Sequence, residues 1–198
     1  MKQRLMSCLP AGALLLWLLL LLPAMRHALE VDMSRHMLIQ IPLLVWVGCG
    51  WASVLPPSLR RVLSDWNRGG ITGLLLVSLW PMVWMLPRAM DAALSTPWVE
   101  ALKFLSLPLL VGVPLALSWP RAGGVVRGLF LSNMLSMLLV AGWLYQVLPQ
   151  QLCANYLLDD QQRLGTNLWW LAAALALLST LHVLSGSRRP AEPWSGRA

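Results

Sequence analysis

The stretch VDMSRHMLIQIPLLVWVGCGW, residues 31–51, joins the most polar, ligand-capable part of the chain to an apolar segment. If it is helical, four side chains recur at i, i+3, i+4 and i+7: Met33, His36, Met37 and Gln40. This spacing places them on one face of the helix. Thioether and imidazole groups suit soft metals, so this face is a candidate Cu(I) site. The alternative is a packing face, on which the methionines contact neighbouring helices and His36 marks the membrane boundary.

The composition places the chain in a lipid bilayer. Of its 198 residues, 58% are hydrophobic and 12% are charged, which is far more apolar than a soluble domain. Several apolar runs approach the roughly 20 residues that a spanning helix needs. We therefore predict an all-α fold, a polytopic bundle of about six transmembrane helices over residues 1–186. A flexible, basic cytoplasmic tail is predicted for residues 187–198.

The six predicted spans alternate with short polar connections. The first follows Lys2 and Arg4, as a signal peptide would, but no small residues of a cleavage site follow it, so we expect a retained span. Asp32 or Ser34 is expected to cap the second span, which Pro56 and Pro57 end. The first span covers approximately residues 8–25, and the second ends near residue 55. The other four cover approximately residues 71–86, 101–119, 125–148 and 168–184.

The basic residues predict the orientation of these spans. The net charge of +7 could indicate nucleic-acid binding, but the positive charges lie in short loops and tails, where orientation explains them better. Ten of the 15 lie on the side of the two termini. The five others are Arg26, Arg35, Arg88, Lys103 and Arg163. The positive-inside rule then predicts that both termini lie in the cytoplasm. We expect the membrane to be the bacterial cytoplasmic (inner) membrane.

The sequence contains no strong signal for catalysis. Cys8, Cys49 and Cys153 form no CxxC pair, and their odd number argues against a disulfide framework. There is no nucleophile elbow, phosphate loop, pair of catalytic carboxylates or zinc-protease motif. We therefore expect a protein that is not an enzyme. Arg88 and Asp91, at i and i+3, are expected to pair and to fix the outer end of the third span.

Two regions resemble motifs of the CtaG-like cytochrome c oxidase assembly factors, polytopic membrane proteins implicated in supplying copper to the oxidase. Residues 32–38, DMSRHML, are similar to the family's His-Met-x-x-His-Met-Leu. Residues 84–94, WMLPRAMDAAL, resemble Trp-His-x-Pro-x-x-x-Asp-Ala-Ala-Leu, and residues 103–106, KFLS, follow where the family has Glu-His-x-Ser. The resemblance covers approximately residues 30–120.

The departures from the family pattern concern its histidines. Asp32, Met85 and Phe104 stand where the family has histidine, and His36 is retained. The resemblance therefore implies either that most of a copper site is lost or that methionines replace it. The predicted Cu(I) ligands are His36, Met33, Met37 and Met85, and the further candidates are Met82, Met90 and His27. Asp32 would orient His36 by accepting a hydrogen bond from its free ring nitrogen.

Three functions compete. The leading hypothesis is a CtaG-like membrane protein that assists copper delivery to, or assembly of, a cytochrome c oxidase, with membrane lipid and a haem–copper oxidase subunit as partners. The second is a metal-free membrane scaffold or accessory subunit of a respiratory complex, which the missing histidines favour. The third is a transporter. The argument against a transporter is that the sequence shows no evident acidic or basic side chain at the membrane centre.

Overall fold

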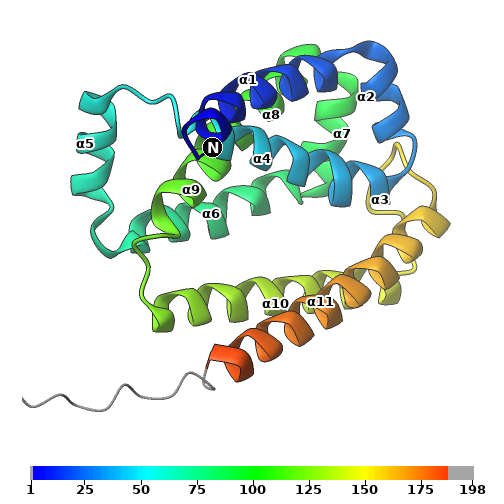
Figure 1. The fold of residues 1–198 in the computed structure, drawn as a ribbon. Coiled ribbons are helices and arrows are strands. Elements are labelled where there is room, and N and C mark those ends of the chain that lie inside the picture. The colour runs from blue at the N-terminus through cyan, green and yellow to red at the C-terminus, as the bar shows by residue number, and fades with distance from the viewer. Residues whose placement is uncertain (1, 187–198) are drawn as a thin grey trace, which may run out of the picture.

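The computed structural model describes residues 2–186, and the side chains of residues 10–181. The predicted tail over residues 187–198 lies outside the described residues. All regular structure in the described part is helical, which confirms the predicted all-α class (Figure 1). Four α-helices begin at a proline, whose fixed φ and missing N–H suit the first turn. They are α2 (Pro23–Glu30), α5 (Pro57–Trp66), α7 (Pro87–Ser95) and α8 (Pro97–Leu107).

The remaining elements complete the chain in order. The N-terminal half contains α1 (Lys2–Leu21), α3 (Met33–Arg35), the π-helix η1 (His36–Gln40), α4 (Ile41–Trp51), the 3-10 turn η2 (Arg68–Gly70) and α6 (Ile71–Trp84). The C-terminal half contains the π-helix η3 (Pro108–Gly112), α9 (Val113–Ser118), α10 (Gly124–Val147) and α11 (Leu158–Gly186).

Long apolar helices indicate a membrane protein, but six separate spans are not evident. Within residues 2–186, three helices are long and apolar enough to cross a bilayer: Pro97–Ser118, Gly124–Val147 and Leu158–Leu181. Two bent pairs, Pro10–Leu21 with Pro23–Glu30 and Arg68–Trp84 with Pro87–Ser95, raise the number to five if each pair is one span.

The predicted second span is not among these candidates. Its helix is continuous from α3 through η1 to α4, but Arg35, His36 and Gln40 occupy its first turns. The apolar part that remains, α4, has 11 residues. This is about half the length that a bilayer core requires.

The helix formed by α8, η3 and α9 lies in the centre of the molecule. Half of its spanning window is buried inside the protein, compared with none of the window in α10. It packs against α4 and α6, and α1 covers α4 from the other side (Figure 1). Leu44, Val47 and Leu107 are completely buried where these helices meet. The N-terminal two thirds of the chain therefore form one packed body.

Two glycines bring α4 and η3 into backbone contact. A Cβ atom on Gly48 would lie 2.0 Å from the carbonyl oxygen of Pro108, and one on Gly112 would lie 2.2 Å from that of Val45. The Cys49 thiol also donates to the carbonyl of Gly112 over 3.3 Å. The close approach of these helices thus depends on the absence of two side chains.

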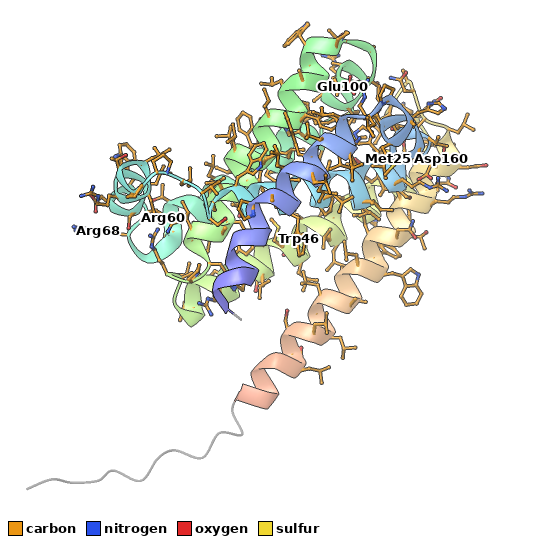
Figure 2. The ribbon with its side chains drawn as sticks, turned by 45° about the horizontal axis from the view of Figure 1, so that its top comes forward. Met25, Trp46, Arg60, Arg68, Glu100 and Asp160 are labelled. Carbon is orange, nitrogen blue, oxygen red and sulfur yellow. The ribbon has the colours of Figure 1, made fainter. Side chains whose placement is uncertain are left out.

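The helices α10 and α11 form a long antiparallel pair beside this body (Figure 1). They pack mainly against each other, and the first turns of α11 also contact α3. The short helix α5 stands apart at the end of the molecule where the connection between α9 and α10 also lies (Figure 1). Figure 2 shows Arg60 and Arg68 at this end, and Met25 and Asp160 at the opposite end.

Replacing Gly48 by alanine should destabilise the fold. Alanine favours a helix by about 1 kcal/mol over glycine, but its methyl group would collide with rigid backbone at Pro108. We expect a net loss of about 1–3 kcal/mol, typical of overpacked sites, measured as unfolding in mixed detergent. Gly128→Ala is the matched control, because nothing lies within 4 Å of its Cβ position. Equal stability of both variants would contradict the proposed backbone contact.

Candidate functional site

A buried lysine organises the polar centre of the molecule. Lys103 on α8 is 1% exposed, and its ammonium group contacts three acceptors. The distances from Nζ are 2.9 Å to Oε1 of Glu30, 3.0 Å to Oε1 of Gln40 and 3.2 Å to Nε2 of His36. An ammonium group has three N–H donors and no acceptor. Every donor of Lys103 is therefore used within the chain.

The hydrogen bonds of Lys103 determine the tautomer of His36. Because the ammonium can only donate, Nε2 of His36 must accept, and the ring proton lies on Nδ1. Nδ1 then donates to the hydroxyl of Tyr156 over 2.8 Å. That hydroxyl donates in turn to the backbone carbonyl of Glu30 over 3.1 Å. His36 is thus a neutral imidazole with both nitrogens engaged.

Gln40 closes the network. Its Nε2 donates to Oε1 of Glu30 over 2.9 Å, while its own oxygen accepts from Lys103. The five residues Glu30, His36, Gln40, Lys103 and Tyr156 are called the lysine network below. They come from α2, η1, α8 and the connection before α11. The π-helical turn η1 carries two of them, and π-helical turns frequently occur at functional sites.

The predicted common face of the second helix is confirmed. Met33, His36, Met37 and Gln40 are each at most 5% exposed, while Ile39 between them is 44% exposed. The two polar side chains of this face join the lysine network. The two methionines pack in a separate buried cluster with Met90, Tyr145, Tyr156 and Cys153, and Met85 contacts its edge. We call this group the methionine cluster.

The structure therefore brings together three of the four predicted copper ligands, Met33, Met37 and Met85, with the further candidate Met90 and with Cys153. Met82 is exposed, as is His27 on α2. In the part of the chain described here, no group of three or more His, Cys, Asp or Glu side chains could hold a metal. A cation at Nε2 of His36 would have to displace the Lys103 ammonium.

Asp32 does not orient His36. It is the N-cap of α3, as the sequence predicted, and accepts from the Arg35 backbone N–H over 2.8 Å. Its other oxygen pairs with the Arg35 guanidinium at 2.9 Å. The acceptor of the hydrogen bond from the His36 imidazole is the Tyr156 hydroxyl, where a carboxylate oxygen of Asp32 was expected. A carboxylate at a helix start satisfies free N–H groups and opposes the helix dipole, which explains its position.

The expected pair of Arg88 and Asp91 is not formed. The carboxylate of Asp91 accepts from the backbone N–H groups of Ala154 and Asn155, over 2.9 and 3.3 Å, and from the Asn155 amide over 2.9 Å. Arg88 on α7 is exposed. The ion pairs within the described residues are Arg26–Glu100, Arg35–Asp32 and Lys103–Glu30. Asp91 thus holds the connection between α10 and α11 against α7.

The connection that Asp91 holds also carries two groups with perturbed acidity. Burial raises the pKa of the Cys153 thiol to about 11, and the nearby negative charge of Asp91 adds to this shift. Burial, together with the charge of Glu30, also raises the pKa of Tyr156. At neutral pH the thiol is protonated, and Tyr156 keeps the hydroxyl proton that it donates to Glu30.

The sequence interpretation missed the centre of this site. Lys103 was counted as an outer basic residue, and Glu30 and Tyr156 were not singled out. A signal was present, because a lysine inside an apolar run such as LKFLSL is costly in a membrane and requires a partner. The sequence does not identify the partners, since Glu30 lies 73 residues before Lys103 and Tyr156 lies 53 residues after it.

The three stretches that carry the family resemblance meet in space. His36, in residues 32–38, contacts Lys103, in residues 103–106. Trp84, which begins residues 84–94, donates its indole N–H to Oγ of Ser106 over 3.1 Å. Comparison with known proteins gives no match: no family model, no curated protein and no solved structure matches this chain.

Removing the ammonium should destabilise the fold strongly. Lys103→Met leaves the Glu30 carboxylate buried without its cation, which typically costs about 3–5 kcal/mol. Unfolding in mixed detergent measures the loss. The double variant Lys103→Met/Glu30→Gln removes both charges and should recover part of it.

Arg35→Gln is the control for this cycle, because it breaks an ion pair whose side chains are 55% and 27% exposed. Such pairs contribute about 1 kcal/mol or less. A loss in Lys103→Met no larger than that in Arg35→Gln would show that the lysine network does not stabilise the fold.

Proposed function

We propose that the chain is a non-enzymatic accessory or assembly protein of a membrane respiratory oxidase, and that its His36 centre works without metal. One observation carries the second part: both nitrogens of His36 are engaged, Nε2 by the Lys103 ammonium and Nδ1 by Tyr156. A metal ion needs a free lone pair on the imidazole and is repelled by a neighbouring ammonium. The lysine network is therefore a structural replacement for a metal centre.

The resemblance to the CtaG-like factors is the reason for choosing an oxidase as the partner. Its support is the contact between the three motif-bearing stretches, which lie far apart in the sequence. Lys103 stands where the family has glutamate, and Phe104 stands where it has histidine. A basic and an aromatic side chain at these two positions keep a packed centre while removing metal ligands. This favours the metal-free scaffold over copper delivery.

A second candidate is a Cu(I)-binding assembly factor. It is favoured by the methionine cluster, in which Met33, Met37, Met85 and Met90 pack together with Cys153. Thioethers bind Cu(I) without losing a proton, so the cluster needs no change in protonation to accept it. In this candidate the ligands are methionines, and His36 remains in the lysine network. Met packing in an apolar core is the alternative explanation for the same cluster.

The two functions differ in how a cell should respond to added copper. We expect a strain lacking this gene to contain less assembled haem–copper oxidase, measured by membrane difference spectra and oxygen consumption. If the protein is a metal-free scaffold, excess copper in the medium should not restore the oxidase. Restoration by copper alone would support the second candidate. An unchanged oxidase level in the deletion strain would refute both.

Matched variants separate the sites. Purified protein incubated with Cu(I) under reducing conditions should carry no copper above the detergent blank. If it does carry copper, Met33→Leu/Met37→Leu should lose it in the second candidate, while Met82→Leu, whose side chain lies exposed outside the cluster, should retain it.

We further propose six spans in a bacterial cytoplasmic membrane, with both termini cytoplasmic. The sixth, in addition to the five candidates above, is the continuous helix from α3 through η1 to α4, whose polar residues His36 and Gln40 are buried against Lys103 of α8. The distribution of basic residues, ten against five, supports this orientation. It is also supported by the contacts at one end between Glu30, His36, Asp91, Asn155 and Tyr156, which all belong to the predicted outer side.

Reporter fusions test this orientation. An alkaline phosphatase fused after Arg35 should be active, because the enzyme folds only outside the cytoplasm, and one fused after Arg68 should be inactive. Fusions of a cytoplasmic reporter at the same two positions provide the complementary control. The reverse pattern would refute the orientation, and equal activity at both positions would refute a span between them.

A further inference from the structure

The helix α5 has two chemically distinct faces. At 100° per residue, Leu59, Val62, Leu63 and Trp66 fall within one arc, and the polar side chains fall on the opposite side. No residue of α5 is buried, and Leu59, Val62 and Trp66 are 43%, 57% and 78% exposed. The helix stands away from the packed body (Figure 1). Its apolar face is therefore not covered by the described chain.

The polar face borders a hollow of about 510 Å³. Arg60, Arg61 and Ser64 of α5 line one wall, and Arg121, from the turn between α9 and α10, lines another. The lining also includes the hydroxyl-bearing Ser53. Three guanidinium groups thus face a space to which no carboxylate contributes, since the nearby Asp65 is not part of the lining.

Two of the three arginines are held in place without being neutralised. Nη2 of Arg60 donates to the carbonyls of Ala52 and Ser53, over 2.8 and 3.3 Å, which fixes its guanidinium beside the hollow. Arg61 donates over 3.4 Å to the carbonyl of Pro57. None of the three is in an ion pair with another described residue. The remaining N–H donors and the excess positive charge match an anion.

We propose that α5 lies in the membrane interface and that this hollow binds the phosphate of an anionic phospholipid headgroup. The uncovered apolar face would rest among the acyl chains, which places the arginines of the opposite face at the level of the headgroups. Guanidinium groups bind phosphate oxygens bidentately, and basic pockets between membrane helices bind anionic headgroups. The apolar face selects a lipid over a soluble phosphate. This proposal does not depend on a role in oxidase assembly.

The test is lipid-dependent thermal stability of the full chain in a neutral detergent. Phosphatidylglycerol should raise the unfolding temperature at lower concentrations than phosphatidylcholine. In Arg60→Gln/Arg61→Gln/Arg121→Gln the apparent affinity for phosphatidylglycerol should fall roughly a hundredfold. The charge-matched control is Arg68→Gln/Arg88→Gln/Arg163→Gln, which changes three exposed arginines outside the hollow and should bind like the wild type.

Two further arms make the result decisive. Glycerol 3-phosphate supplies the phosphate without acyl chains and should give no comparable stabilisation; if it stabilises as well as the lipid, the ligand is a soluble phosphate and the lipid proposal fails. If the triple variant does not fold, Arg121→Gln, which leaves the backbone bonds of Arg60 and Arg61 intact, should weaken lipid binding roughly fivefold. Equal binding by the wild type and the folded pocket variants would overturn the proposal.

Discussion

The buried ammonium group of Lys103 constrains the path of the chain around it. A charged group removed from water is tolerated only when its donors are satisfied and its charge is balanced. The balancing carboxylate, Glu30, is at the last position of α2, so α2 must turn back toward α8. This requirement is consistent with the 75° bend between the apolar end of α1 and α2. The acceptors His36 and Gln40 lie on the π-helical turn that follows.

The same network connects the body to the α10–α11 pair. Tyr156, in the connection between these two helices, donates to Glu30 and accepts from His36. Asp91 holds the neighbouring residues of this connection through three hydrogen bonds. A change at Lys103 would therefore be transmitted through one imidazole to the position of a separate helical pair. This link connects the lysine network to the surface that the helical pair presents.

Local rules predicted the helical class, the cap at Asp32 and the common face of Met33 and Gln40 correctly, because each depends only on neighbouring residues. The predicted pair of Asp91 with Arg88 was wrong because the partners of Asp91 are distant in the sequence. Its spacing from Arg88 permits a pair, but backbone donors 63 and 64 residues away were better placed. The apolar part of the second span is shorter than expected, because the polar residues at its start do not mark a boundary. In the structure they continue the helix and are buried by α8 and α2.

The two ends of the molecule differ in how completely their polar groups are satisfied. In the lysine network, each ammonium donor has an acceptor within the chain, and the one cation is matched by one carboxylate. At the α5 end, three arginines provide five N–H donors each, and the described structure pairs them only with the carbonyls of Ala52, Ser53 and Pro57. The first arrangement leaves no ammonium donor of Lys103 for an added anion. The second leaves most of its donors directed to the surroundings, where they are available to the external anion that we propose.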